Sequence, residues 1–295
     1  MKNYVCIDVG GTSIKYGFIR EDGFIIDKSS MDTEAKEKGG EGILSKIKQI
    51  VKKYIEENDI SGICISTAGM VDPIEGKILF ALEELIPNYK GMELKKEIEK
   101  EFNVKCEVEN DVNCAGLGEM WIGAGKGATS SVCLTIGTGI GGCVIINNKL
   151  INGFSNSAGE VGYMNINGSS FQELASTSSL VKKVAKIKSL NENDLNGKII
   201  FDLAKNNDED CLKELNNMIK SLAVGIANIC YVINPEVVIL GGGIMAQEEF
   251  LKPKIDKALK EVLIDRVYKN TNVEFANRQN DAGMLGALYN FLNKI

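Results

Sequence analysis

The sequence contains no histidine, although it is 295 residues long. Without an imidazole there can be no Ser-His or Cys-His catalytic pair, no histidine-ligated metal and no histidine general base. Proton transfer in any reaction must therefore fall to aspartate, glutamate, lysine, tyrosine or cysteine. This one absence excludes several large classes of enzyme.

Long apolar runs and clusters of basic residues are also missing. No segment approaches the ~18 apolar residues of a membrane-spanning helix, and the start, MKNYVCIDVGG, lacks the apolar stretch of a signal peptide. The net charge is −6 and the basic residues are scattered, which argues against nucleic-acid and anionic-membrane surfaces. We therefore expect a cytoplasmic protein with neither nucleic acid nor membrane as a partner.

The eight cysteines form no C-x-x-C pair, and most stand singly inside apolar runs such as YVCID and GICIS. This pattern favours buried, reduced thiols over disulfides. Hydrophobic residues make up 44% of the chain and charged residues 25%, as in soluble globular proteins. The length suffices for two domains with cores of their own.

Two segments of the chain resemble each other: VCIDVGGTSIKYGFIREDGFII from Val5 and VCLTIGTGIGGCVIINNKLIN from Val132. Each predicts a strand, a glycine turn, a second strand, a tight polar turn and a third strand. Helices and strands then alternate. After the first copy we predict helices over 42–57 and 92–102 and from 111, and strands over 62–67 and 104–110. After the second we predict helical stretches from 171, helices over 211–232 and 248–263 and from 282, and strands over 236–242 and 272–276.

The chain thus reads as one β-β-β-α-β-α-β-α unit used twice, which predicts an α/β protein with two similar lobes across a cleft. No Pro- or Ser-rich linker separates the copies, so the helix near Asp111 is the expected join. We assign residues 1–115 to an N-terminal lobe and 116–295 to a C-terminal lobe. The last helix, 282–295, is a candidate to pack back on the first lobe.

The two glycine turns are candidate phosphate sites, because backbone N–H groups without side chains in the way can point at an anion. Neither is a P-loop or a dinucleotide fingerprint, since a strand follows where those motifs require a helix. A third glycine segment, ILGGGIMAQEEF, does lie between a strand and a helix but lacks the acidic residue of a Rossmann site. Any one of these turns could be only a tight hairpin. Two at equivalent points of a repeat could clamp a polyphosphate, with Lys15 and Mg²⁺ balancing its charge.

The segment EVENDVNCAGLGE places Asn110 and Asp111 between a predicted strand and a predicted helix. Either residue could cap that helix. Asp111 could also be a general base, with Asn110 orienting a hydroxyl group beside it. The two roles are compatible, and the sequence leaves both open. A polar loop over 152–170, with Glu160 as its one charged residue, is either functional or disordered.

Taken together, these motifs resemble the ROK family of sugar kinases and regulators, on the two-lobed actin/hexokinase-like (ribonuclease H-like) fold. The resemblance covers the whole chain. IDVGGTSIK is similar to the family's first phosphate motif, ENDVNCAGLGE to its catalytic motif and LTIGTGIGGC to its second phosphate motif. SAGEVGY is similar to its sugar loop, and NPEVVILGGGI to its adenosine segment.

The resemblance implies ATP and Mg²⁺ as cofactors and assigns roles to particular residues. Asp8 would hold the magnesium ion through water. The ATP phosphates would meet Gly10, Gly11, Thr12, Gly137, Thr138 and Gly139, and the adenosine would meet Gly241, Gly242 and Gly243. Sugar hydroxyls would meet Gly69, Asn110, Asp111, Glu160 and Glu173, and Asp111 would be the general base.

The sequence departs from the family pattern in the sugar loop. Most members have a histidine where Tyr163 stands here, followed by a cysteine cluster that binds a structural zinc ion. Both are missing together, which implies a zinc-free branch. Tyr163 either packs as an aromatic or replaces a hydrogen bond to the sugar, and the sequence leaves both open.

The implied activity is transfer of the ATP γ-phosphate to a hydroxyl group, expected to be O6, of a glucose-type hexose or N-acetylmannosamine. A β-glucoside kinase is the alternative. A sugar-sensing regulator would need a DNA-binding segment ahead of the first hairpin, and a polymerising actin-like protein would leave the glutamates of the sugar loop unexplained. Family members are commonly homodimers, so we expect a homodimer here.

Overall fold

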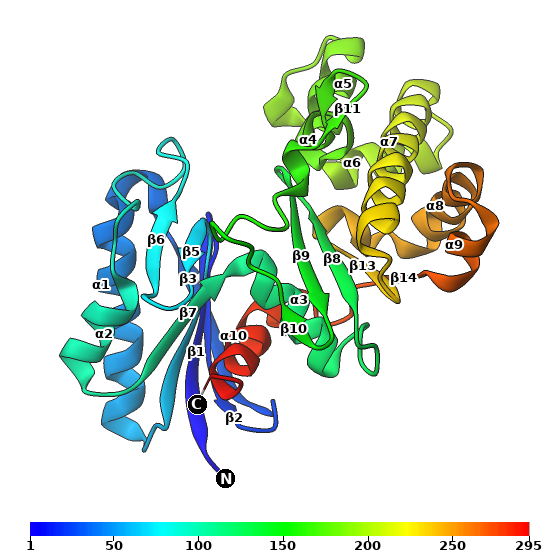
Figure 1. Ribbon diagram of the computed structural model, residues 1–295. Coiled ribbons are helices and arrows are strands. Elements are labelled where there is room, and N and C mark those ends of the chain that lie inside the picture. Colours follow the sequence, from blue (N-terminus) through cyan, green and yellow to red (C-terminus); the bar gives the residue numbers. More distant parts are fainter. Residues whose placement is uncertain (295) are drawn as a thin grey trace. The chain divides into compact units, whose positions relative to one another are not determined.

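The computed structural model describes residues 1–294 and consists of two compact units. The first unit holds Met1–Lys126, Asn152–Ser157 and residues 280–294, and the second holds Gly127–Ile151 and Ala158–Gln279. Each unit is a sheet with helices packed on it (Figure 1). The first unit keeps the whole helix that begins at Asp111, whereas the sequence suggested a boundary at residue 115.

A five-stranded sheet in the order β3-β2-β1-β4-β7 forms the centre of the first unit. An antiparallel meander is formed by β1 (Asn3–Val9), β2 (Ser13–Arg20) and β3 (Ile25–Asp32). The other two strands, β4 (Gly62–Thr67) and β7 (Cys106–Asn110), are parallel to β1 in successive pairs. Because parallel strands end at the same edge of a sheet, the residues at the ends of β1, β4 and β7 lie along one edge.

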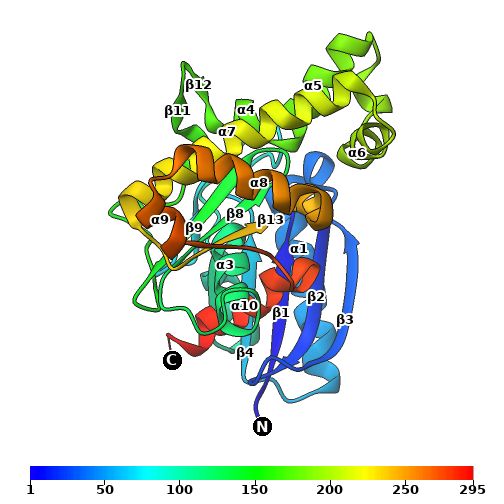
Figure 2. The same cartoon turned by 90° about the vertical axis from the view of Figure 1, so that its right-hand side faces the viewer.

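Helices cover both faces of this sheet. One face packs against α1 (Ala35–Glu57) and α2 (Leu94–Phe102) (Figure 1), and the other against α3 (Asp111–Ile122) and α10 (Ala282–Leu292) (Figure 2). Successive side chains of a strand point to opposite faces. The odd-numbered apolar residues of β1 accordingly pack in the cluster of α1 and α2, and the even-numbered ones in the cluster of α3 and α10.

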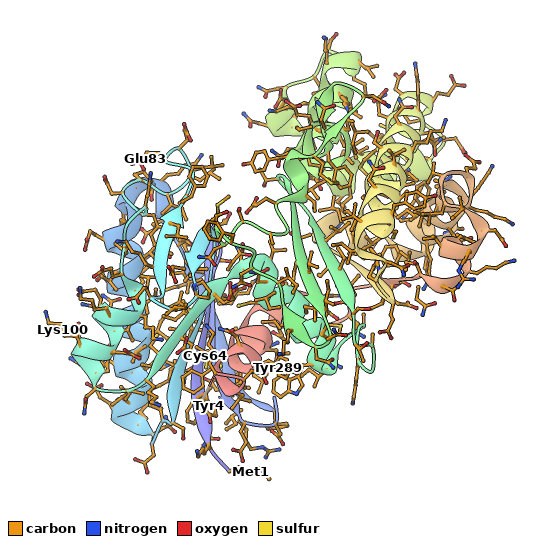
Figure 3. The ribbon with its side chains drawn as sticks, in the orientation of Figure 1. Met1, Tyr4, Cys64, Glu83, Lys100 and Tyr289 are labelled. Carbon is orange, nitrogen blue, oxygen red and sulfur yellow. The ribbon has the colours of Figure 1, made fainter. Side chains whose placement is uncertain are left out.

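The C-terminal helix α10 lies in the first unit. It packs against α3 and against the strands β1 and β4. The side chains of Tyr4, Cys64 and Tyr289 mark this part of the molecule in Figure 3. The rings of Tyr4 and Phe291 meet edge to face with centroids 5.3 Å apart, and Trp121 stacks on Tyr289 at 5.2 Å.

The second unit repeats the strand arrangement of the first. Its sheet has the order β10-β9-β8-β13-β14. The strands β8 (Ser131–Ile136), β9 (Ile140–Ile146) and β10 (Lys149–Leu150) are antiparallel, and β13 (Val237–Gly241) and β14 (Asn272–Phe275) add parallel strands. In both sheets a meander of three strands is thus followed by two parallel strands. The duplication predicted from the sequence is confirmed.

Helices of the second unit share one apolar cluster with its sheet. The longest is α7 (Glu209–Ile233), which begins after Asp208, whose side chain accepts a hydrogen bond from the backbone N–H of Cys211. An aspartate in this position satisfies one of the N–H groups that a helix start leaves without a partner. The others are α4 (Phe171–Ala175), α5 (Thr177–Lys188), α6 (Gly197–Lys205), α8 (Glu248–Val262) and α9 (Asp265–Asn270).

The structure adds elements that the sequence did not predict. A hairpin of β5 (Met70–Asp72) and β6 (Lys77–Phe80) follows β4. The helix expected over 42–57 begins earlier, at Ala35, and is kinked at Gly39. The polar loop over 152–170 was predicted to be either functional or disordered. It contains a short helical turn, Val161–Tyr163, and the two-residue strands β11 (Asn165–Ile166) and β12 (Ser169–Ser170).

All eight cysteines are buried and free, which confirms that prediction. Within residues 1–294, no helix combines the length and the apolar character needed to cross a membrane.

Candidate active site

The edge of the first sheet places Asp8 beside two polar partners. Asp8 lies opposite Ser66 of β4 and Lys15 of β2 in the strand register. Ser66 Oγ donates to Asp8 Oδ1 at 2.6 Å, and Lys15 Nζ lies 3.9 Å from Asp8 Oδ2 and 3.2 Å from Oδ1 of Asn280. Burial raises the pKa of Asp8, and the hydrogen bond from Ser66 and the charge of Lys15 offset part of that rise.

The start of α10 packs directly on this carboxyl group. A Cβ atom added to Gly283 would lie 2.5 Å from Asp8 Cγ, so the helix can come this close only with glycine there. Asp8 and the first turn of α10 are 275 residues apart in the sequence but adjacent in the structure.

The first glycine turn joins β1 to β2. Gly10 N–H donates to the Ser13 carbonyl at 3.0 Å, and Thr33 donates through Oγ1 to the Gly10 carbonyl at 2.7 Å and through N–H to the Thr12 carbonyl at 2.8 Å. Around the Cβ position of Gly11 there is no atom within 4 Å. Thr33 thus holds the turn in place through two hydrogen bonds. The space beside Gly11 is open, which leaves room for an anion at the turn.

Asn110 ends β7 and is the N-cap of α3. Its Oδ1 accepts hydrogen bonds from the backbone N–H groups of Val112 at 2.9 Å and Asn113 at 3.0 Å. Its Nδ2 donates to the Gly69 carbonyl at 2.9 Å and to Asp111 Oδ1 at 3.0 Å. The sequence left open which residue caps the helix, and the structure assigns the capping to Asn110.

Asp111 is thereby the first residue of the helix, with a carboxyl group held in place by its neighbours. Burial and then the negative charge of Asp8 raise its pKa to about 7, although hydrogen bonds from Val112 N–H and the Asn110 side chain act in the opposite direction. A pKa near neutrality suits a general base, since the group is both available in its ionised form and basic enough to accept a proton.

Gly69 lies beside these residues, because its carbonyl accepts the hydrogen bond from Asn110 Nδ2. Its φ is +98°, and a Cβ atom there would lie 2.7 Å from the Phe80 carbonyl. Glycine is therefore required both by the backbone conformation and by the close approach of β6. The first unit thus brings together Asp8, Lys15, Gly69, Asn110 and Asp111 along one edge of its sheet.

The second unit has a pocket of about 270 Å³ at its own glycine turn. The pocket combines the second hairpin with the sugar-loop residues and the glycine segment after β13. It is lined by Thr135, Gly137, Thr138, Gly139, Ile140, Gly141, Glu160, Tyr163, Gln172 and Gly242.

The side chains of this pocket include two of the three predicted from the sugar loop. Partial desolvation raises the pKa of Glu160, although the residue is exposed. Tyr163 is 57% exposed, so it does not pack in the core. The third predicted side chain, Glu173, is not among the lining residues. Its Oε2 accepts hydrogen bonds from Ser170 N–H and Ser170 Oγ, both at 2.9 Å, in a capping box at the start of α4. These bonds lower the pKa of Glu173.

Gln172 is a pocket residue that the sequence analysis missed. A Cβ atom on Gly139 would lie 2.7 Å from its Oε1, and one on Gly162 would lie 3.1 Å away. The amide therefore packs between the second hairpin and the sugar loop. Its neighbour Glu173 was predicted because it matches a position of the family pattern, whereas Gln172 matches none. Ser66 was missed as well; its signal was a hydroxyl group in an otherwise apolar strand, GICIST.

The segment predicted to meet adenosine begins at the end of β13. Gly242 has φ +100°, and a Cβ atom there would lie 2.2 Å from the Ile136 carbonyl of β8. Gly241 is buried, and Gly243 has open space at its Cβ position. Contact with adenosine stays a prediction for all three.

The first unit offers one carboxylate to a magnesium ion. Mg²⁺ is commonly held by one or two carboxylates together with phosphate oxygens and waters. Asp8, which is buried and has a raised pKa, offers such a single carboxylate. Across residues 1–294, no group of three or more histidine, cysteine, aspartate or glutamate side chains could hold a metal ion by itself.

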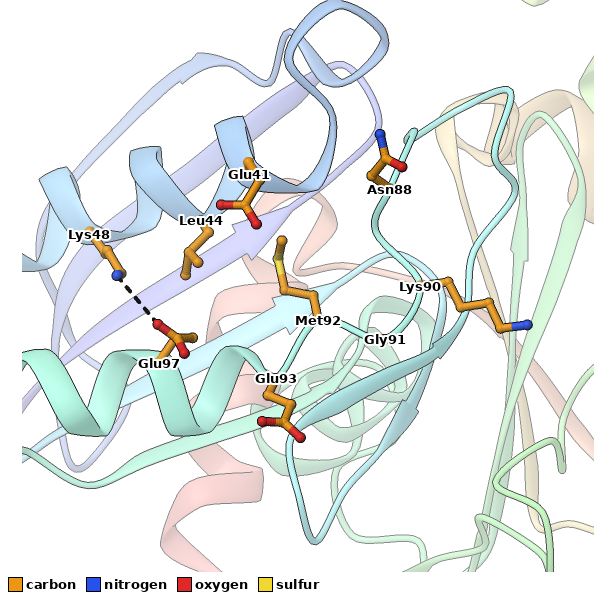
Figure 4. A pocket seen from close by; sticks show the side chains of 9 residues that line it. All are labelled: Glu41, Leu44, Lys48, Asn88, Lys90, Gly91, Met92, Glu93 and Glu97. Atoms are coloured by element: carbon orange, nitrogen blue, oxygen red, sulfur yellow. Dashed lines mark ion pairs between the residues drawn. The ribbon is translucent and has the colours of Figure 1, made fainter.

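The first unit also has a groove of about 520 Å³ between α1, α2 and the segment before α2 (Figure 4). Its lining includes Glu41, Lys48, Glu93 and Glu97, and the Lys48 Nζ–Glu97 Oε2 ion pair of 3.8 Å spans it. None of the predicted site residues lines this groove.

Two units that repeat a three-stranded meander and two parallel strands, each with a glycine hairpin, define an actin/hexokinase-like fold. Among solved structures, a Streptomyces griseus ROK glucokinase in complex with glucose and AMPPNP is 27% identical, with a TM-score of 0.82, over 97% of this chain and 98% of that one. A Listeria monocytogenes protein described as a candidate N-acetylmannosamine kinase is 30% identical, with a TM-score of 0.88, over 99% of both chains.

A β-glucoside kinase of Listeria innocua is 31% identical over 295 residues, which are 97% of this chain and 96% of that protein. The model described as ROK family matches residues 4–294. The protein belongs to the ROK family.

Proposed function

We propose that this protein is an ATP- and Mg²⁺-dependent sugar kinase of the cytoplasm, which transfers the γ-phosphate to O6 of a hexose. The observation that carries the proposal is the Asn110–Asp111 pair, in which a capping asparagine fixes a carboxyl group whose pKa is raised to about 7. The three relatives named above are kinases or are described as such, which supports the same class of reaction.

Asp111 is the general base in this proposal. A sugar hydroxyl is far too weak an acid to be ionised in advance by a carboxylate, so the proton moves to Asp111 as the O–P bond forms. Asn110 orients Asp111 through the 3.0 Å bond to Oδ1, and its bond to Gly69 places the Gly69 backbone beside the same carboxyl group. In phosphoryl transfer, such positioning supplies a large part of the rate acceleration.

The phosphates of ATP are assigned to the glycine turns. Backbone N–H groups of Gly11 and Thr12, and of Thr138 and Gly139, would donate to phosphate oxygens, and Lys15 would add a positive charge. Gly10 and Gly137, whose N–H groups donate to the Ser13 and Gly139 carbonyls, would line the two turns beside the phosphates. Bound Mg²⁺ would neutralise charge on the transferring phosphoryl group. Asp8 would hold that ion through water, oriented by Ser66.

The sugar is assigned to Gly69, Asn110, Asp111, Glu160, Tyr163 and Glu173. For Tyr163 we favour the hydrogen-bonding role, because the side chain is exposed and lines the pocket. For Glu173 the assignment requires its carboxylate to bind sugar in addition to capping α4. We propose glucose or N-acetylmannosamine as the substrate, and a β-glucoside as the second candidate, which the 31% identity to a β-glucoside kinase favours.

The experiment is a coupled assay of ADP release with Mg²⁺ATP and glucose, N-acetylmannosamine, cellobiose or no sugar. We expect sugar-dependent ADP release, and phosphorus NMR of the product identifies the phosphorylated hydroxyl group. ADP release that no sugar increases would contradict the proposal and favour a sugar-binding regulator. Light scattering tests the expected homodimer.

A further inference from the structure

Glu109 is a buried carboxyl group that the proposed mechanism does not use. It precedes Asn110 on β7 and is 1% exposed. Its Oε1 accepts hydrogen bonds from Asn110 N–H at 2.9 Å and from Asn113 Nδ2 at 3.0 Å. Its Oε2 is buried without a hydrogen-bond partner among residues 1–294. An ionised carboxylate with one bare oxygen is a costly state in a protein interior.

The side chain of Asn152 lies within hydrogen-bond reach of Glu109 and, with its amide N–H toward the carboxylate, lowers the pKa of Glu109. Its Oδ1 is also buried and, in the described part of the chain, has no partner either. With the amide turned so that Oδ1 faces the carboxyl group, Oε2 of Glu109 and Oδ1 of Asn152 are two acceptors that can share one proton. A protonated carboxyl group donates through one oxygen and still accepts through the other, and the hydrogen-bond network decides which end of an amide faces it.

Burial favours the neutral form of Glu109. Burial raises the pKa of Glu109, while the hydrogen bonds from Asn113, Asn110 and the Asn152 side chain and the charge of Lys294 offset part of that rise. Glu109, Asp8 and Asp111 all raise the pKa of the buried Cys114 thiol on α3, so the three carboxyl groups surround one side chain. When Glu109 is protonated, at most two of these three neighbouring carboxyl groups carry a negative charge.

We propose that Glu109 is a neutral carboxylic acid whose Oε2–H donates to Oδ1 of Asn152, and that it is a positioning residue for Asp111. Its Oε1 fixes the backbone of Asn110 and the side chain of Asn113, and both residues belong to the N-terminal turn that carries Asp111. The positioning role rests on the proposed function, whereas the protonation state does not.

The test compares wild type with Glu109→Gln, Glu109→Leu and Glu107→Gln. Glutamine keeps the acceptor for Asn110 and Asn113 and places an N–H donor toward Asn152, whereas leucine does neither. Glu107 lies on the same strand, but its carboxylate pairs with Lys95 at 2.8 Å and Lys294 at 3.1 Å, so the same change there is a matched control.

Infrared difference spectra at neutral pH are the direct readout. We expect the carbonyl stretch of a protonated carboxyl group in wild type minus Glu109→Gln, and its absence in wild type minus Glu107→Gln. This measurement does not depend on kinase activity, so it separates failure of this proposal from failure of the proposed function. Absence of the band for Glu109 would overturn the proposal.

Kinetics test the positioning role. We expect Glu109→Leu to lower kcat by about 10- to 100-fold with little change in the KM for sugar, and Glu109→Gln to restore kcat to within a few-fold, since misplacement of a base costs rates of this order. The pH midpoint of kcat should be the same in Glu109→Gln and wild type. A lower midpoint would mean that the mutation removed a negative charge, and would overturn the proposal. If Glu109→Leu does not fold, the spectra and the pH midpoint decide.

Discussion

Ser66 and Asp8 lie opposite each other on the parallel strands β4 and β1, and the Ser66 hydroxyl donates a 2.6 Å hydrogen bond to Asp8 Oδ1. This bond counteracts the burial that raises the pKa of Asp8. Ser66 therefore favours the ionised form of Asp8, which is the form that a hydrated metal ion requires.

Replacing Ser66 by alanine should weaken the use of Mg²⁺ATP. Without its donor, the Asp8 carboxylate loses a charge-assisted bond worth about 1.5–3 kcal/mol, so we expect the KM for Mg²⁺ATP to rise by about tenfold or more. The KM is measured at several concentrations of free Mg²⁺. Ser131→Ala is the control, because Ser131 is likewise a fully buried strand serine, and its Oγ has no partner among the described residues. Equal effects of the two mutations would contradict the assignment.

Replacing Asp111 by asparagine should abolish phosphoryl transfer while sugar binding largely survives. Loss of a general base typically costs ~10²–10⁴ in rate, and no histidine is present to substitute for it. Initial rates measure kcat, and calorimetry measures sugar binding. Asp265→Asn makes the same change at the first residue of α9 and should leave kcat unchanged. A mutant Asp111→Asn with kcat within a few-fold of wild type would leave Asp111 only a structural role.

The rate should depend on pH through Asp111. The pKa of this group is raised to about 7, so the base is protonated in more than half of the molecules below that pH. We expect kcat/KM for the sugar to fall about tenfold per pH unit below the midpoint and to level off above it. The residual rate of Asp111→Asn should lack this step. A profile that stays flat well below neutrality would show that Asp111 is not the titrating base.

Because of the same raised pKa, Asp111 should lower the free energy of unfolding at neutral and higher pH. The folded protein binds the proton of Asp111 more tightly than the unfolded chain does, with a pKa of about 7 against 3.8. The protonated carboxyl group therefore contributes to the free energy of unfolding below about pH 4. This contribution, up to about 4 kcal/mol, is lost as the pH rises to about 7. Asp111→Asn should thus gain stability over wild type across that range, with a plateau above it. Denaturant unfolding at several pH values measures the difference, and a difference independent of pH would refute the prediction.

Activity should depend on magnesium and not on zinc. A structural zinc site needs four ligands, normally cysteine or histidine, and the sequence has no histidine. The cysteines lie buried in the cores, away from the sugar loop in sequence. Elemental analysis of protein purified without added metal, together with activity after a zinc-selective chelator, checks this. About one zinc ion per chain, with activity lost on its removal, would show that the loop is held by metal.

Much of this protein follows from local sequence. Strand alternation and glycine turns predicted both meanders, and the repeat of the whole unit predicted two similar sheets, because these patterns depend on neighbouring residues only. The polar pair at the end of β7 was located the same way. The motifs that matched a known family also pointed to Glu160 and Tyr163, which the structure places in one pocket with the second hairpin.

Other features depend on contacts between distant segments, which no local pattern specifies. The sequence could not decide whether Asn110 or Asp111 caps α3, nor that the carboxylate of Glu173 is engaged by Ser170. Ser66 acquires its role only when the parallel pairing of β4 with β1 sets it against Asp8. Glu109 and Asn152 meet only in the folded chain, where burial removes the water that would otherwise satisfy their oxygens. Residue type and spacing determined which groups were available, and the long-range register of strands and the exclusion of water decided how those groups are paired and charged.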